Sequence, residues 1–375
     1  MSEMNNQGGY CGVAIIGLDH WYWAYGCAYA VAVHPQASLI GIADRDGERV
    51  KKMAELYRAK NWETDYNTLL RNPEVDAVII TSTMDLHPEI VKDAADAGKD
   101  ILVGKPIART LQEADQIIEA VDKAGVKLRC LDTKARKGDP VRSWIDSGVI
   151  GKPYMAHCSV LAIPPIRAPG VKEPGWFADP YKCTGGGFID HAIYQIADLR
   201  WYFGQEVKRV YAEMGRFVLK SWAIEDHGIA LVKFKDGAVA TLEASNTAPR
   251  QTHSRTLLIG TEGEIEIRGQ TISIWSKKEE YKYRQTLELI PPPSIYETTY
   301  AKIPVPTPPY AEGFKPVVDE FIECVIDDTE PMVTAEDARA NLEVCLAAYE
   351  SVRVKKPVTL PLQKEVDVPS ILERL

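Results

Sequence analysis

Two short clusters of residues carry side chains that can move protons. In Gly104-Lys105-Pro106, a lysine held ahead of a proline can donate a hydrogen bond to a substrate hydroxyl and lower the pKa of that hydroxyl or of a neighbouring acid. Asp190 and Tyr194 follow three consecutive glycines, and residues four apart share one face of a helix, so both can meet one ligand. The alternatives are structural: a surface lysine in a turn, and an aspartate at a helix N-terminus beside a core tyrosine.

A first strand and turn typical of a dinucleotide-binding fold lie between Val13 and Tyr22. Such folds normally place Gly-x-Gly-x-x-Gly between the strand and the helix. Here only Gly17 keeps the pattern, because Asp19 and Tyr22 stand at the other two glycine positions. An Asp19 carboxylate aimed at a pyrophosphate would repel it, so we expect Asp19 either to cap the helix or to bind through its backbone N–H.

Asp44 ends the second β-rich run, where an acidic residue can accept hydrogen bonds from the adenosine ribose and exclude a 2′-phosphate by charge. This favours NAD over NADP, although the neighbouring Arg45 could accommodate a 2′-phosphate and Asp44 could instead cap a turn. The other expected cofactor contacts share a place at the turns that follow the strands. They are Gly17, Asp19, His20, Trp21, Ser82, Thr83, His87, Gly104 and Lys105.

The elements that must position these residues form two domains in a chain of 375 residues. Residues 1–131 alternate buried β-rich runs with helical patterns, which predicts a Rossmann-type α/β domain with a parallel sheet. The expected strands there are 13–16, 39–43, 75–80, 101–103 and 126–131. Residues 132–375 predict a second α/β domain with a large, mostly antiparallel open sheet and two late helices. Its expected elements are the strands 154–161, 207–213, 228–234, 238–244, 256–259, 264–268 and 271–275, and the helices 141–147, 314–326 and 335–352.

Composition narrows the class of function. The 44 basic and 53 acidic residues give a net charge of −9, which disfavours nucleic acid as a partner. Seven scattered cysteines lack CxxC spacing and are expected to be buried, reduced thiols, and the seven histidines show no ligand spacing, so no metal site is expected. The N-terminus lacks the regions of a signal peptide and no stretch could span a membrane, so we expect a cytoplasmic protein without a membrane partner.

Taken together, these motifs resemble the glucose-fructose oxidoreductase, inositol dehydrogenase and rhizopine-catabolism (Gfo/Idh/MocA) family, from about Gly12 to Leu362. That family usually shows Glu-Lys-Pro, here Gly104-Lys105-Pro106, and a triple glycine before Asp-x-x-x-His, here Asp190 and Tyr194. The segments 147–151 and 330–351 also look like it. The resemblance implies a Rossmann domain followed by an α/β domain whose open sheet often makes an oligomer interface, so we expect a homo-oligomer, dimer or tetramer.

By resemblance, the protein is an NAD-dependent dehydrogenase that moves a hydride between the nicotinamide and a secondary hydroxyl of a sugar, sugar derivative or cyclitol. Lys105, Asp190 and Tyr194 are then catalytic, with Tyr194 as the acid–base and Lys105 favouring its ionised form. Counting from Gly185 as the first family glycine instead puts His191 and Gln195 at the catalytic places, so His191 stays an alternative. The implied substrate contacts are Lys105, His157, Arg167, Trp176, Asp190, His191 and Tyr194.

Two other functions stay open. A redox-neutral, nicotinamide-dependent lyase or glycosidase would regenerate its cofactor in each cycle and turn over substrate without net NADH. A non-catalytic ligand-binding module is suggested by the incomplete glycine turn and by Gly104 in place of the family's glutamate. Failure to bind either dinucleotide would support that module.

Overall fold

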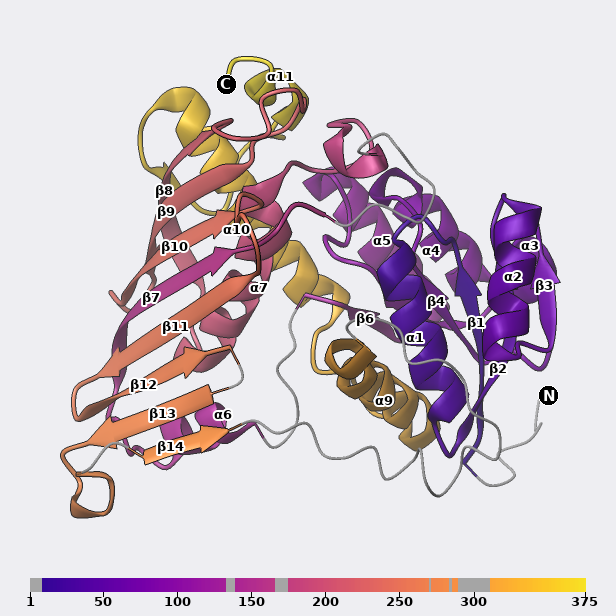
Figure 1. The fold of residues 1–375 in the computed structure, drawn as a ribbon, viewed down its shortest axis with the longest axis horizontal. Helices are drawn as coiled ribbons and strands as arrows, with labels where there is room; N and C mark the ends of the chain where they lie inside the picture. The colour runs from indigo at the N-terminus through magenta and orange to yellow at the C-terminus, as the bar shows by residue number, and fades with distance from the viewer. Residues whose placement is uncertain (1–8, 133–138, 166–174, 270, 283–284, 289–310) are drawn as a thin grey trace. The chain divides into compact units, whose positions relative to one another are not determined.

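The computed structural model describes residues 9–132, 139–165, 175–269, 271–282, 285–288 and 311–375 (Figure 1). They form two compact units. The first holds the described residues up to 108 together with 113–132 and 311–338, and the second holds the remainder. A division at residue 131 alone therefore does not describe the chain, because residues 311–338 belong to the first unit.

The first unit is built on a six-stranded parallel sheet in the order β3-β2-β1-β4-β5-β6, which is the strand order of a Rossmann fold. The order reverses at β1, and ligands bind at such switch points. The predicted fold of this part is confirmed. The strands are β1 (Cys11–Ile16), β2 (Ala37–Ala43), β3 (Asn61–Glu63), β4 (Ala77–Ile80), β5 (Asp100–Val103) and β6 (Leu128–Cys130).

Helices connect these strands, and each of the four longer ones leaves the sheet from a strand's carboxyl end. Asp46 begins one of them by accepting hydrogen bonds from the backbone N–H groups of Glu48 and Arg49. The peptide bond between Lys105 and Pro106 after β5 is cis. The helices are α1 (Trp21–Val33), α2 (Gly47–Tyr57), α3 (Asn67–Leu70), α4 (His87–Asp96) and α5 (Leu111–Ala124), with a short 3-10 turn at Met84–Leu86.

Helix α9 (Ala311–Asp327) returns late in the chain to pack on α1 in the first unit. Gly26 of α1 allows this contact, because a Cβ atom at that position would lie 2.4 Å from the ring of Phe314. Phe314 is 7% exposed and packs on the rings of Tyr22 and Trp23. Burial of these aromatic surfaces explains why α9 belongs with a domain that ends about 180 residues earlier in the sequence.

The second unit contains a nine-stranded sheet in the order β14-β13-β12-β11-β7-β10-β9-β8-β15. Only the pair of β7 and β10 is parallel, so the prediction of a large, mostly antiparallel sheet is confirmed. Gly237, with φ near +100°, turns the chain between β9 and β10 as expected of Asp236-Gly237. The strands are β7 (Pro153–Leu161), β8 (Val207–Gly215), β9 (His227–Phe234), β10 (Val239–Ser245), β11 (His253–Gly260), β12 (Gly263–Arg268), β13 (Thr271–Ser276), β14 (Gln285–Glu288) and β15 (Val358–Thr359).

One face of this sheet is covered and the other is open. Along β9, Ala230 and Val232 are buried whereas Ile229 and Leu231 are 48% and 52% exposed, an alternation expected of a sheet covered on one side. Helix α7 lies against the covered face (Figure 1). The helices of this unit are α6 (Pro140–Asp146), α7 (Gly187–Phe203), α10 (Ala335–Val354), which begins in the first unit, and α11 (Val368–Leu372), with short 3-10 turns at Gly175–Ala178 and Glu279–Tyr281.

Sequence reasoning missed five short helices and strands: β3, α3, β14, β15 and α11. Three are strands of two to four residues at or near a sheet edge, and two residues of β3 are exposed. Short, exposed strands show no buried apolar run, which is the signal that revealed the others. The seven cysteines all lie among the described residues as buried free thiols, as predicted.

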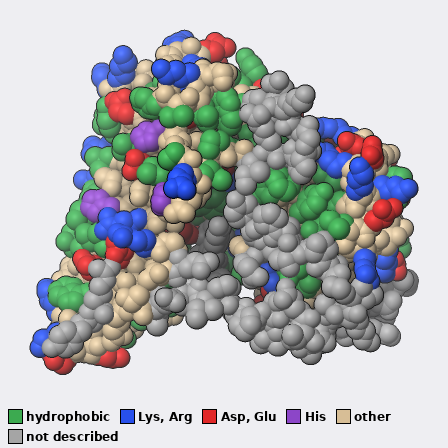
Figure 2. Space-filling model, in the orientation of Figure 1, with side chains coloured by type: hydrophobic (Ala, Val, Ile, Leu, Met, Phe, Trp, Pro, Cys, Tyr) green, Lys and Arg blue, Asp and Glu red, His purple; other side chains and the backbone are tan. Residues whose placement is uncertain are grey.

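No helix among the described residues is long and apolar enough to cross a membrane. On the face shown in Figure 2, basic and acidic side chains are interspersed over the described surface.

Candidate active site

The turn between β1 and α1 requires a glycine at position 17. Gly17 has φ near +84°, and a Cβ atom there would lie 2.7 Å from the backbone of Ser82. The Thr81 hydroxyl donates to the Gly17 carbonyl at 2.5 Å, which ties the turn to the end of β4. The turn thus keeps the close backbone approach that a phosphate-binding turn needs.

The Asp19 carboxylate pairs with arginine side chains that follow β2. Helix α1 has His20 at its N-cap without a side-chain hydrogen bond, whereas the Asp19 carboxylate pairs with Arg45 at 2.8 Å and lies 3.6 Å from Arg49. Burial raises the pKa of Asp19, and the two arginines oppose that shift. The negative charge that would repel a pyrophosphate is therefore balanced by two guanidinium groups.

Asp44 is held by several donors at the end of β2. Its carboxylate is 1% exposed and accepts hydrogen bonds from the backbone N–H groups of Leu18 and Asp46 at 2.7 and 2.8 Å. Arg49 adds two contacts of 2.7 Å. Sequence reasoning named the exposed Arg45 and missed Arg49. Arg49 stands five residues after Asp44, in the first turn of α2, and this place in the sequence could have indicated its role.

The other predicted cofactor residues lie at the carboxyl ends of β1, β4 and β5. Ser82, Thr83 and His87 are all buried, and His87 Nδ1 lies 3.1 Å from the carbonyl oxygen of Ile107. Burial lowers the pKa of His87, so its ring is neutral near pH 7. The side chains of Ser82, Thr83 and the neutral His87 therefore add no charge of their own to this part of the sheet edge.

The predicted residues of α1 form an aromatic group. The His20 ring lies 4.1 Å from the ring of Trp23 and 4.5 Å from that of Tyr22. Trp21 contacts Tyr22 and Tyr25 edge to face. His20 and Trp21 thus sit where the glycine turn meets the helix, and aromatic packing takes the place of the missing third glycine.

Lys105 is not the surface lysine that the alternative interpretation supposed. It follows β5 and is only 4% exposed, and its Nζ atom lies 5.7 Å from the centre of the Trp23 ring. A lysine is almost never buried without a specific reason. Its burial at the carboxyl edge of the sheet favours a functional role.

In the second unit, the glycines 185–187 give α7 a close contact with the segment before β9. Cβ atoms at Gly186 and Gly187 would lie 1.9 and 2.5 Å from the carbonyl oxygens of Glu225 and Asp226. Neither glycine has a positive φ, so these glycines are required for the space that they leave to the neighbouring backbone. The Glu225 carboxylate accepts hydrogen bonds at 2.9 and 3.0 Å from the N–H groups of Gly186 and Phe188 and thereby anchors the start of the helix.

Asp190 and His191 meet at Asn246, which sequence reasoning missed. His191 Nε2 lies 2.8 Å from Asn246 Oδ1, and both Asn246 Nδ2 and His191 Nε2 lie 3.5 Å from Asp190 Oδ2. Asn246 is 2% exposed and directly follows β10, so it is part of the rigid sheet. No local pattern marks it, because it stands 56 residues from Asp190 along the chain.

Tyr194 lies one helical turn beyond Asp190 and is half-buried, so α7 places both on one side as predicted. Trp176 stacks on the neighbouring Phe177 with ring centres 4.1 Å apart.

His157 lies on β7, where its Nδ1 atom is 2.8 Å from the hydroxyl oxygen of Thr241. In this strand, half-buried residues such as His157 alternate with the buried residues that face α7. The structure therefore does not bring His157 to Asp190. Arg167 lies outside the described residues.

We predict that the buried Glu225 carboxylate makes stability depend on pH. Burial raises its pKa from an ordinary 4.5 to about 7, against the hydrogen bonds of Tyr349 and Gly186 that lower it. The folded state therefore holds more protons than the unfolded state between these values, so this contribution is complete below pH 4.5 and is lost as the pH rises to 7. The loss amounts to about 3 kcal/mol.

Thermal melting of wild type and Glu225→Gln across this pH range measures that contribution. The amide mimics the protonated acid, so the variant should lose the part of the pH dependence that Glu225 causes. The prediction would be contradicted if the melting temperatures of the two proteins changed with pH in the same way.

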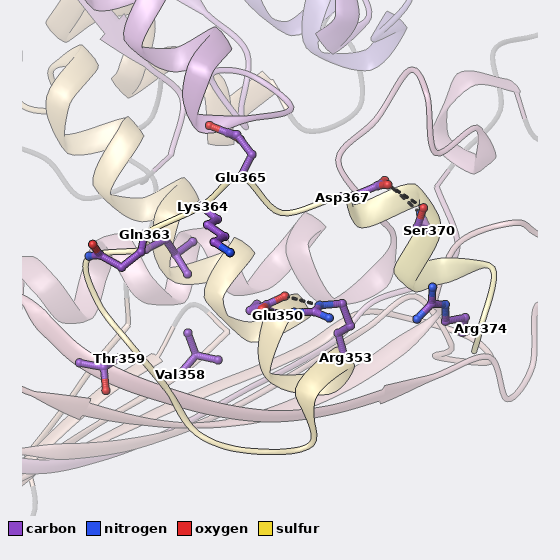
Figure 3. Close-up of a pocket in the computed structure, with 11 residues that line it drawn as sticks. Glu350, Arg353, Val358, Thr359, Gln363, Lys364, Glu365, Asp367, Ser370 and Arg374 are labelled. Atoms are coloured by element: carbon purple, nitrogen blue, oxygen red, sulfur yellow. Dashed lines mark hydrogen bonds and ion pairs between the residues drawn. The ribbon is translucent and has the colours of Figure 1, made fainter.

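A groove of about 530 Å³ lies elsewhere in the second unit, between α10, β15 and α11 (Figure 3). Charged side chains line it, including the ion pair of Glu350 and Arg353. None of the predicted site residues lines this groove. Among the described residues, no three His, Cys, Asp or Glu side chains gather in a way that could hold a metal ion.

Comparison with protein families identifies both parts of the chain. Residues 11–131 match the model of an oxidoreductase family with an NAD-binding Rossmann fold, and residues 140–266 match the GFO/IDH/MocA C-terminal domain. The scyllo-inositol 2-dehydrogenase (NAD(+)) of Bacillus subtilis (strain 168) is 30% identical over 367 residues, which cover 94% of this chain and 97% of that protein. The myo-inositol 2-dehydrogenase of Thermotoga maritima is 25% identical over 337 residues, covering 86% and 91%.

Solved structures share the fold. Levoglucosan dehydrogenase in complex with NADH superposes with a TM-score of 0.80 at 22% identity, covering 94% of this chain and 99% of that one. An oxidoreductase domain protein from Kribbella flavida gives a TM-score of 0.81 at 21% identity, covering 95% and 100%. With the two domain matches and the full-length relative, these findings place the chain in the Gfo/Idh/MocA family of oxidoreductases, with an NAD-binding Rossmann domain at its N-terminal end.

Proposed function

We propose that the protein oxidises a secondary hydroxyl of a sugar, sugar derivative or cyclitol and transfers the hydride to NAD. The observation that carries this proposal is the full-length relative at 30% identity, which is a scyllo-inositol 2-dehydrogenase that uses NAD(+). The Thermotoga maritima relative is a myo-inositol 2-dehydrogenase, which supports the same substrate class. Substrates of this class are neutral polyols, which require acid–base groups and hydrogen-bond donors but no metal.

The residues of the first unit fit this cofactor. Gly17 provides a backbone cradle that a Cβ atom would fill, and Asp44 provides a buried carboxylate for ribose hydroxyls. NAD, when bound, supplies the hydride acceptor. The chain's own task is to orient the hydroxyl and remove its proton.

We assign that task to Lys105, Asp190 and Tyr194. Lys105 would donate to the hydroxyl oxygen and favour the ionised form of the base. Tyr194 would take the proton, and Asp190 would orient the hydroxyl from the first turn of α7. His191 and Asn246 hold Asp190 in place, and Trp176 offers an aromatic face to the substrate ring.

The proposal is tested by following absorbance at about 340 nm while the purified protein meets NAD or NADP with aldoses, inositols, glycosides and anhydrosugars. Growth of the signal with one class establishes both the dehydrogenase and its cofactor. Substrate loss without such growth, seen by chromatography, would instead indicate the redox-neutral lyase or glycosidase. Absence of binding to either dinucleotide would indicate a ligand-binding module.

Asp44 is expected to determine the cofactor preference. Replacing Asp44 by serine removes a charged acceptor, so we expect the KM for NAD to rise roughly 10- to 100-fold while NADP improves beside Arg45 and Arg49. Asp46→Ser is the matched control, because serine caps a helix as well as aspartate and Asp46 begins α2 in this way. An unchanged ratio of NAD to NADP efficiency in Asp44→Ser, with normal melting, would remove Asp44 from this role.

We also propose that the protein is a homo-oligomer that associates through the open face of the second unit's sheet. The exposed Ile229 and Leu231 of β9 lie on that face, where a second copy would bury them. Sedimentation analysis should give a dimer or tetramer, and Leu231→Lys should weaken it. A monomeric wild type at micromolar concentration would contradict this proposal.

A further inference from the structure

We propose that Trp23 holds Lys105 in its catalytic position. Its indole ring fills the space that a side chain at residue 104 would need. This inference rests on the proposed function, because it concerns how the catalytic lysine is positioned. Trp23 belongs to α1 and Lys105 follows β5, and both are in the first unit. Trp23 is thus a positioning residue rather than a group that touches the substrate.

The space beside Lys105 is already occupied. A Cβ atom at Gly104 would lie 3.2 Å from Cζ3 of Trp23 and 3.6 Å from Cε1 of His87. A longer side chain such as glutamate would have to displace the indole. Gly104 and Trp23 therefore form a matched pair, in which the absence of a side chain at one position admits the large ring of the other.

Neighbouring rings keep the indole from moving away. Trp23 is 3% exposed, and its ring centre lies 4.1 Å from that of His20 and 5.7 Å from that of Phe314. Phe314 is itself wedged against Gly26, where a Cβ atom would lie 2.4 Å from its ring. Helix α9, which is far from α1 in the sequence, thus contacts Trp23 through Phe314 and restricts the movement of the indole.

The contact between Trp23 and Lys105 suits a buried catalytic cation. The ammonium nitrogen lies 5.7 Å from the ring centre, within the range of a cation–π interaction, and both residues are at most 4% exposed. The negative face of an aromatic ring attracts the ammonium charge and so restricts where the lysine side chain can lie. The contact thus fixes the ammonium group of Lys105 at the carboxyl edge of the sheet.

A double-mutant cycle tests the pairing of residues 23 and 104. Trp23→Leu should lower kcat roughly 2- to 30-fold, and Trp23→Phe should lower it less because phenylalanine offers a weaker ring face. Gly104→Glu alone should lower kcat and the melting temperature, since its side chain meets the indole. In Trp23→Leu/Gly104→Glu, the carboxylate has room beside Lys105, so kcat should recover above that of either single variant.

Controls separate positioning from loss of packing. Tyr29→Leu truncates another buried ring of α1, 1% exposed, and should lower the melting temperature without changing kcat. The substrate KM and the calorimetric affinity for NAD should stay within about twofold of wild type in the Trp23 variants, because positioning acts on the chemical step. Wild-type kcat in a folded Trp23→Leu, or no recovery in the double variant, would overturn the inference.

A spectroscopic measurement tests the contact between Trp23 and Lys105 without an activity assay. In protein labelled with 5-fluorotryptophan, the fluorine resonance that Trp23→Phe removes is assigned to Trp23. Lys105→Met should shift that resonance, whereas Lys99→Met, which changes a lysine after α4, should not. If wild type oxidises no polyol, the proposed function fails while this readout still tests the contact. If Lys105→Met leaves the Trp23 resonance unchanged, the inference fails while the proposed function stands.

Discussion

Replacing Tyr194 by phenylalanine is expected to lower kcat by roughly 10²- to 10⁴-fold, the usual loss when a general acid–base group is removed. The substitution deletes one hydroxyl and keeps the ring, so α7 should stay folded. The KM of the substrate should change little, because the proton transfer belongs to the transition state. Initial rates of NADH formation with the substrate found in the polyol panel measure both quantities.

The comparison with His191 makes this result decisive. His191 Nε2 is engaged with Asn246 at 2.8 Å and lies beside Asp190, an arrangement that orients the aspartate. His191→Asn should therefore lower kcat by only about tenfold, the effect of a less well-oriented neighbour. The opposite ranking, a large loss in His191→Asn and a small one in Tyr194→Phe, would give the acid–base role to His191.

Tyr202→Phe is the matched control for the hydroxyl deletion. Tyr202 lies on the same helix, and burial raises its pKa well above the ordinary value, so it does not ionise in the working range. Its variant should keep the wild-type kcat. A comparable loss of kcat in Tyr202→Phe would mean that the helix, rather than the Tyr194 hydroxyl, accounts for the effect.

Replacing Lys105 by methionine is the second change with a large expected effect, a fall in kcat of roughly 10²- to 10³-fold. Methionine keeps most of the volume of the buried side chain and removes its charge. The loss should come from the missing donor to the hydroxyl oxygen and from weaker ionisation of the base. Single-turnover measurements of hydride transfer report this step directly.

The pH profile gives the sign of the Lys105 effect. A nearby positive charge favours the ionised form of a phenol, whose ordinary pKa is about 10. Without that charge, the acidic limb of kcat/KM against pH should move to higher pH in Lys105→Met, and Lys105→Arg should leave it nearer to wild type. A limb at an unchanged pH in Lys105→Met would show that Lys105 does not tune the base.

The architecture of both domains follows from local patterns in the sequence. Strands buried on both faces read as apolar runs, so β1, β2, β4 and β5 were predictable, and the alternating runs indicated the antiparallel sheet. Gly17 was predictable because the turn after a first strand needs a glycine there. Lys105 and Asp190 were predictable as candidates from their neighbours in the chain, and the family matches agree with the resemblance from which their roles were taken.

The partners of these residues depended on the tertiary structure. Arg49 binds Asp44, because the first turn of α2 brings Arg49 back to the end of β2. Asn246 reaches Asp190 and His191 only because β10 ends beside α7. His157 looked like a substrate contact, but strand alternation puts it among the residues of β7 that face away from α7.

The sequence by itself thus determined which residues stand at strand ends and helix starts, because these places depend on short stretches of chain. It could not determine which side chains meet, because those contacts join segments far apart in the chain. The first unit shows the reason most clearly. Trp23 and Lys105 are brought together by packing between α1, β5 and α9, and no local pattern records how three such elements fill a common space.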